Sequence, residues 1–412
     1  MSEARSVRAR SLIAAVERHP VAAVFAVALV ARTLVALVVY WRFGGSLLLD
    51  DATYSEMAAT KAAGEAGAWA PYVDWLYLRT GVLLVPITGL YALFGPVKLL
   101  GQLYVALLGA ATAAVTTRLA LEAVARRWAL AAGLVVALLP SQVLWSSLIL
   151  KDAGVWLVLS ALALVVALAG RADGARLVAL GGAAAGLLTL LGFLRLHTLV
   201  VAGVALVLTA WVGSRHCRVR RVAVAALLAV SIPWLAFGIG PAGIGIVSTS
   251  TSASLGERRA ENARQSNTAV VPPAPGAAGT PTPPGDELAT SNLAYLPRGL
   301  SVILFEPVPW SSGGPVLLDL ARGEALLWYP LLALALVGLT SVRRHLRVAA
   351  FPLVVGCGIA VMYALVEGNV GTAYRHRGEV VWVVALGCAL GLVQLQRLRP
   401  RVRRGRFVEP AG

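Results

Sequence analysis

The chain has 412 residues, of which 58% are hydrophobic and 14% are charged, and its formal net charge is +16. This composition excludes a soluble globular enzyme, and the recurring runs of about 20 apolar residues indicate a polytopic, all-α membrane protein. The three cysteines, Cys217, Cys357 and Cys388, are too few and too scattered for a disulfide framework or a cysteine metal site.

The apolar segments predict about ten transmembrane helices. The first segment is longer than the apolar core of a signal peptide and no cleavage site follows it, so we expect it to be retained. Arg32 lies near its middle and is expected to face the protein interior, because a charge in contact with lipid is costly. The ten predicted spans are 20–41, 97–117, 128–147, 153–170, 177–194, 198–213, 222–240, 324–342, 348–366 and 379–396.

Arginines gather in every second loop when the N-terminus is placed in the cytoplasm, and the loops between them are nearly neutral. This alternation follows the positive-inside rule and places both termini in the cytoplasm. The excess of positive charge is therefore a signal of topology, and we expect no nucleic-acid partner. The basic C-terminal tail is suited to contact with anionic lipids of the bilayer.

This topology predicts five parts. They are a cytoplasmic basic N-terminus (1–19), an N-terminal transmembrane core (20–240) with a first outer loop (42–96), an extracytoplasmic loop (241–323) with a flexible Pro-rich part (270–285), C-terminal transmembrane helices (324–396) and a cytoplasmic basic tail (397–412).

The first outer loop contains an acidic pair, Asp50 and Asp51, followed by a predicted short helix over 52–64. The later part, 75–95, is apolar but interrupted by Arg79, Pro86 and Gly89. We interpret it as juxtamembrane or re-entrant helices along the outer interface. A true transmembrane span is the alternative, but it would place the following loops on the wrong sides of the membrane. In the second outer segment, 296–310 is a further predicted interfacial element.

Ionisable and polar residues close to the span ends fall on one predicted membrane face. A carboxylate there can act as a general base, and arginine or lysine can bind a phosphate. The candidate catalytic residues are Asp50 and Asp51. The candidate substrate and lipid-phosphate ligands are Lys151, Asp152, Arg195, His197, Glu367, Asn369, Arg375, His376 and Arg377.

Each group also has a structural interpretation. The acidic pair can be a solvated turn, and Lys151 with Asp152 can be an ordinary helix start. Arg195 and His197 can be interfacial anchors. Zinc binding by His197 and His376 has no support from ligand spacing. We therefore predict no metal site and no firmly implied cofactor.

The segment Asp50-Asp51-Ala52-Thr53-Tyr54-Ser55-Glu56-Met57-Ala58 resembles the GT-C superfamily of membrane glycosyltransferases, as do 90–95, Leu139-Pro140-Ser141 and 146–152. The resemblance covers roughly the N-terminal 200 residues. The family pair is commonly Asp-Glu, and here Leu47-Leu48-Leu49 replaces the usual His or Pro before it. The loops at 369–372 and 375–377 are similar to loops of bacterial cell-envelope polysaccharide membrane proteins.

The resemblance implies a GT-C-like fold, a catalytic acid at Asp50 or Asp51 and a polyprenyl-phosphate-sugar donor. We expect an inverting hexosyl- or pentosyltransferase that acts on a glycan, lipid or protein acceptor at the extracytoplasmic face. The composition suggests a multi-pass protein of a bacterial inner (plasma) membrane. The alternative is a transporter, flippase or polymerase of lipid-linked saccharides. Transporters tend to carry charges near the bilayer midplane, where the sequence places only Arg32.

Overall fold

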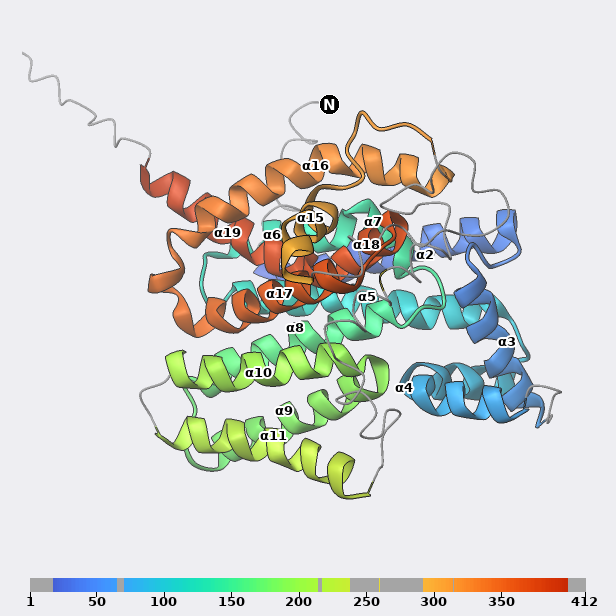
Figure 1. The fold of residues 1–412 in the computed structure, drawn as a ribbon, viewed down its shortest axis with the longest axis horizontal. Coiled ribbons are helices and arrows are strands. Elements are labelled where there is room, and N and C mark those ends of the chain that lie inside the picture. The colour runs from blue at the N-terminus through green and yellow to red at the C-terminus, as the bar shows by residue number, and fades with distance from the viewer. Residues whose placement is uncertain are drawn as a thin grey trace, which may run out of the picture.

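The computed structural model describes residues 18–64, 70–213, 217–237, 259, 292–313 and 315–398, and the secondary structure of these parts is helical (Figure 1). In chain order the helices are α2 (Pro20–Phe43), α3 (Leu49–Ala63), α4 (Ala70–Phe94), α5 (Lys98–Ala120), α6 (Arg126–Leu138), α7 (Pro140–Trp145), α8 (Asp152–Ala169), α9 (Gly174–Leu194), α10 (Leu196–Gly213), α11 (Cys217–Phe237), α15 (Asn292–Phe305), α16 (Val316–Leu339), η1 (Val342–Arg344), α17 (Leu346–Val366), α18 (Val370–Arg377), η2 (Gly378–Val380) and α19 (Val381–Leu398).

Seven helical segments in these parts of the chain are long and apolar enough to cross a membrane. They are Pro20–Phe43, Lys98–Ala120, Asp152–Ala169, Gly174–Leu194, Val316–Leu339, Leu346–Val366 and Val370–Leu398. An all-helical, polytopic membrane protein is therefore supported. The predicted spans 198–213 and 222–240 correspond to α10 and α11, which are outside this set of seven. The Pro-rich part at 270–285 lies outside the described residues.

The long helices run side by side across Figure 1, and α3 crosses their direction close to the end of α2. The most extensive pairings join α16 with α19, α2 with α5, and α5 with α8. Small residues permit one of these close approaches. A Cβ atom at Gly338 would overlap the carbonyl oxygen of Gly387, and one at Gly391 would overlap that of Leu334. The α16–α19 pair therefore packs backbone against backbone, as membrane helices do at small residues.

One predicted span, 128–147, is wrong as a single helix. Its residues form α6 and α7, with Leu139 extended between them at φ −60° and ψ 127°. Pro140 explains the interruption, because it has no N–H and it disfavours a helical conformation at the preceding residue. At this break, the carbonyl oxygens of Val136 and Ala137 are left without the donors of a continuous helix.

Two buried charged side chains from other helices make hydrogen bonds to the backbone groups that are free at the end of α6 and the start of α7. Arg32 of α2 donates from Nη2 to the carbonyl oxygen of Val136 (3.0 Å) and from Nη1 to that of Ala137 (2.9 Å). Glu324 of α16 accepts hydrogen bonds from the backbone N–H (2.5 Å) and hydroxyl (2.8 Å) of Ser141. The cation lies at a helix C-terminus and the anion at a helix N-terminus, so each complements the helix dipole. The expected interior position of Arg32 is confirmed.

The segment predicted as the first outer loop (42–96) begins and ends at the same end of the bundle, where Lys98 Nζ donates to Ser46 Oγ at 3.1 Å. The helix predicted over 52–64 begins earlier, at Leu49. The apolar part that follows is a single helix, α4, which continues through Pro86, where the sequence predicted interrupted helices. Because the two ends of this segment lie close together, α3 and α4 belong to a long connection between α2 and α5 at one end of the bundle.

Candidate functional site

Three segments that are far apart in the sequence meet at one buried carboxylate. Asp152 begins α8 and is fully buried. Its Oδ1 accepts from Arg195 Nη2 at 2.7 Å, and its Oδ2 accepts from Arg375 Nε at 2.9 Å and lies 2.8 Å from Arg375 Nη2. Arg195 lies between α9 and α10, whereas Arg375 belongs to α18. Paired with two arginines, Asp152 does more than begin a helix, so the simple helix-start interpretation is incomplete.

Arg375 also reaches the segment predicted as the first outer loop (42–96). Its Nη1 donates to Asp50 Oδ2 at 2.9 Å. The Asp50 side chain is 55% exposed, whereas that of Arg375 is 13% exposed. The same guanidinium therefore holds one carboxylate that is inaccessible, Asp152, and one that solvent can reach.

The two members of the acidic pair occupy different environments. Asp51 is fully buried, and its carboxylate accepts hydrogen bonds from the backbone N–H groups of Leu47 (3.1 Å) and Leu48 (2.9 Å). It therefore caps the first turn of α3. Burial raises the pKa of Asp51, and the backbone hydrogen bonds oppose that shift. Asp51 supports the helix start, and Asp50 alone of the pair faces the arginine.

The other side of Arg195 contacts groups that the sequence did not indicate. Its Nη1 donates to Glu379 Oε1 and to the hydroxyl of Tyr363, the latter at 2.7 Å. Tyr363 donates to Glu379 at 2.5 Å, and Thr198 donates to the same carboxylate at 3.3 Å. Arg195 is 5% exposed. The interpretation of Arg195 as an interfacial anchor is therefore wrong.

The two predicted histidines flank Tyr363. His376 stacks on its ring, with the centroids 4.2 Å apart, and His197 Nε2 lies 3.3 Å from its hydroxyl. His376 Nδ1 lies 2.7 Å from Glu367 Oε1. Glu367 is buried, and its Oε2 has no hydrogen-bond partner among the described atoms. The histidines are thus joined to the network through an aromatic ring rather than through direct contact with Asp152.

Lys151 lies beside this network and is half-buried. Burial, together with the positive charge of Arg195, lowers the pKa of Lys151 to about 8. No hydrogen bond or ion pair is recorded for its ammonium group within the described parts of the chain. A partly desolvated cation of this kind is suited to an anion supplied from outside.

The last predicted loop, between the predicted spans 348–366 and 379–396, contains a helix, because Val370–Arg377 form α18. Asn369 caps α18, because its Oδ1 accepts from the backbone N–H of Gly371 at 2.8 Å. Arg377 is on the same helix but does not join the group around Asp152. It lies deeper, 3.7 Å from Glu324 Oε1, with Trp328 and Tyr374 rings each 4.9 Å from its guanidinium.

Two buried acids that lie against predicted site residues, Glu379 against Arg195 and Glu324 against Arg377, were not among the predicted site residues. Glu324 lies inside α16, since this helix begins at Val316 and not at the predicted boundary of 324. Glu379 precedes α19, and it was treated as the first residue of an apolar span. In both cases a carboxylate at the edge of an apolar run was the available signal.

Among the residues that the structure describes, no group of three or more His, Cys, Asp or Glu side chains is arranged to hold a metal ion. Comparisons with protein-family models, with curated proteins and with solved structures gave no match.

Proposed function

We propose that the protein is a membrane glycosyltransferase that transfers a sugar from a polyprenyl-phosphate-linked donor to a hydroxyl of a cell-envelope acceptor. The observation that carries the proposal is the ion pair between Asp50 and Arg375, which joins an accessible carboxylate to a phosphate-binding type of side chain. The topology predicted from the arginine-rich loops would place this pair at the extracytoplasmic face, where the headgroup of such a donor can lie.

In the proposed reaction, Asp50 takes the proton of the acceptor hydroxyl, and the oxygen of this hydroxyl attacks the anomeric carbon of the donor sugar. The bond between this carbon and the phosphate oxygen breaks, and the electron pair leaves with polyprenyl phosphate. Attack from the opposite side inverts the anomeric centre. Asp50 is the better base of the acidic pair because its carboxylate is accessible, whereas Asp51 is committed to two backbone N–H groups.

Arg375 and Lys151 bind the donor phosphate in this proposal. Asp152 and Glu379 already balance Arg195 and Arg375, so Lys151 adds a positive charge that no described carboxylate contacts. A phosphate that binds to Arg375 competes with Asp50 for the same guanidinium. Donor binding would then release the Asp50 carboxylate for the acceptor hydroxyl, so the donor would bind before the acceptor.

Transfer of label tests the proposal. Purified protein in detergent is supplied with polyprenyl phosphates that carry radiolabelled sugars, together with membrane lipid and glycan fractions as acceptors. We expect label to move from the donor into one acceptor fraction, with release of polyprenyl phosphate. Absence of transfer from every donor, by protein that is folded and monodisperse, would contradict the proposal.

The interrupted helix favours a second candidate, a transporter or flippase of lipid-linked saccharides. Transporters often place broken helices and buried charges near their substrate, and the structure buries Glu324 and Arg377 in addition to Arg32, whose interior position the sequence predicted. However, the groups freed at the break are bonded to Arg32 and Glu324, which suits a structural role. Translocation of a fluorescent lipid-linked saccharide by the protein in vesicles, without any sugar transfer, would favour this candidate.

A further inference from the structure

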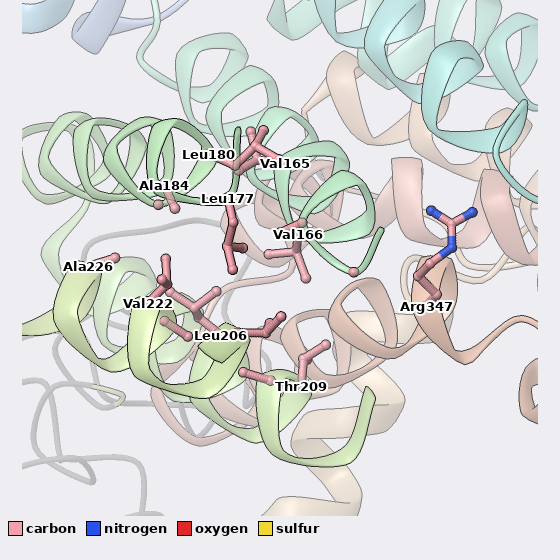
Figure 2. A pocket seen from close by; sticks show the side chains of 16 residues that line it. Val165, Val166, Leu177, Leu180, Ala184, Leu206, Thr209, Val222, Ala226 and Arg347 are labelled. Carbon is pink, nitrogen blue, oxygen red and sulfur yellow. The ribbon is translucent and has the colours of Figure 1, made fainter. Parts of the chain in front are cut away.

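A narrow apolar cavity lies at the opposite end of the bundle from the acidic pair. It is bounded by α8, α9, α10 and α11 (Figure 2). The cavity volume is about 50 Å³, and the empty space that includes its opening to the outside is about 580 Å³. A cavity so narrow and so apolar fits a chain of methylene groups better than a sugar or an aromatic ring. Its walls include Val165, Leu177, Leu180, Ala184, Leu206, Val222 and Ala226.

One polar side chain of the cavity wall lacks a partner. Thr209 is 5% exposed, and its hydroxyl makes no hydrogen bond within the described parts of the chain. Other helical residues of this type, such as Thr112 and Thr189, donate to the carbonyl four residues earlier. A buried hydroxyl without a partner is costly, typically by about 1–3 kcal/mol. The Thr209 hydroxyl is therefore a donor available to a ligand in the cavity.

Arginines gather at one end of the cavity, which we call its mouth, because Arg347 lines this end and Arg171 follows the lining residue Gly170 in the chain. Arg347 lines the cavity and lies close to Gly170, where an added Cβ atom would be 2.9 Å from Arg347 Cγ. Glu122 accepts from Arg347 Nη2 at 3.2 Å, from Arg118 Nη1 at 2.8 Å and from Arg171 Nη1 at 3.3 Å. One carboxylate faces three guanidiniums, and the side chain of Arg171 is 66% exposed. The mouth therefore retains positive charge that is open to an anionic headgroup.

We propose that this cavity is a binding site for an anionic diacyl glycerophospholipid. The phosphate lies at the arginines of the mouth, an ester carbonyl accepts the hydrogen bond of Thr209, and one acyl chain enters the cavity. An ester-linked lipid fits the three features together, since a polyprenyl phosphate has no carbonyl for Thr209 and carries branched methyl groups. Arg118 and Arg347 lie in the terminal turns of α5 and α17, and Arg171 follows α8. The positive-inside rule assigns these helix ends to the cytoplasm, whose leaflet is rich in anionic lipid.

This site is separate from the network around Asp152 and does not depend on the proposed glycosyltransferase activity. Its residues lie near the other end of α8, where Arg347 Nη1 donates to the carbonyl oxygen of Ala167 at 2.7 Å. Lipid binding can therefore be measured whether or not the donor and the acceptor are known.

The sharpest test compares two phosphatidylglycerols that differ only in having ester or ether linkages. The protein in detergent is titrated with each lipid, and bound lipid is counted by native mass spectrometry. We expect the wild type to retain the ester lipid about fivefold better than the ether lipid, the scale of one hydrogen bond. Thr209→Val removes the hydroxyl at nearly constant size and is expected to abolish the preference. Thr189→Val, which removes a hydroxyl outside the cavity wall, is the matched control and keeps it.

A second pair of variants tests the position of the acyl chain. Ala184→Leu fills the cavity, whereas Ala183→Leu adds the same side chain at the neighbouring exposed position of α9. We expect only Ala184→Leu to lose bound phosphatidylglycerol. A thermal unfolding transition measured for each variant checks that both are folded. The proposal is overturned if the wild type binds ester and ether lipids equally, if phosphatidylcholine binds as well as phosphatidylglycerol, or if Ala184→Leu and Ala183→Leu bind lipid alike.

Discussion

Arg375 Nη1 lies 2.9 Å from Asp50 Oδ2, although 325 positions separate the two residues in the chain. The same guanidinium holds the buried Asp152 from its other edge. This single side chain therefore connects the first turn of α3 to the start of α8.

Removing the charge of Asp152 should destabilise the protein. Asp152→Asn keeps the shape of the side chain but leaves Arg195 and Arg375 short of a buried partner. Breaking a buried ion pair from one side costs about 3–5 kcal/mol. We expect a clear fall in Tm for the protein in detergent. Asp173→Asn, at an exposed position before α9, is the control, and an equal Tm in the two variants would contradict the role of Asp152.

The charge of Lys151 should make donor binding depend on pH. Its pKa of about 8 means that the ammonium group is present below pH 8 and is lost as the pH rises through that value. If this cation binds the donor phosphate, kcat/KM for the donor falls between pH 7 and pH 9 in the wild type. Lys151→Gln should show a lower kcat/KM without this fall, and Lys151→Arg should extend the plateau to higher pH. A profile of Lys151→Gln that matches the wild type would argue against phosphate binding by Lys151.

Arg32 should be required for stability through the broken helix. Arg32→Met keeps a long apolar stem but removes the donors to the carbonyl oxygens of Val136 and Ala137. Each buried acceptor left without a donor costs about 1–3 kcal/mol. We expect a lower Tm and faster proteolysis between α6 and α7, with transfer activity per folded molecule retained. Loss of activity without loss of stability would instead point to a functional path at the interruption.

The glycine contact between α16 and α19 should not tolerate a side chain. In Gly391→Val, the new atoms would overlap the carbonyl oxygen of Leu334, so the two helices must separate. We expect the free energy of unfolding to fall by about 3 kcal/mol or more, the upper end of the usual cost of overpacking. Gly182→Val, at an exposed helical glycine with open space around it, should be nearly neutral in the same thermal unfolding measurement.

The long apolar helices followed directly from the sequence, because membrane spans depend on composition over about 20 residues. The break at Pro140 was harder to predict, since proline is tolerated in membrane helices when neighbours satisfy the freed backbone groups. Those neighbours, Arg32 and Glu324, come from helices distant in the sequence. Such partners cannot be predicted from the sequence pattern around Pro140 alone.

The candidate site was predicted in part. Charge placement selected Asp50, Asp152, Arg195 and Arg375, which the structure brings together. Arg377 was grouped with them by its proximity to Arg375 in the sequence. However, α18 is a helix, and residues two positions apart on a helix face different directions. That geometry sends Arg377 toward Glu324 instead.

The most direct measurement is the rate of sugar transfer by Asp50→Asn beside Asp51→Asn, each corrected for the folded fraction. We predict that Asp50→Asn lowers the rate by at least about 100-fold, the scale of a general base, while Tm stays close to that of the wild type. Asp51→Asn should instead lower Tm, because it weakens the cap of α3, and should retain transfer per folded molecule. Full transfer by Asp50→Asn would contradict the account.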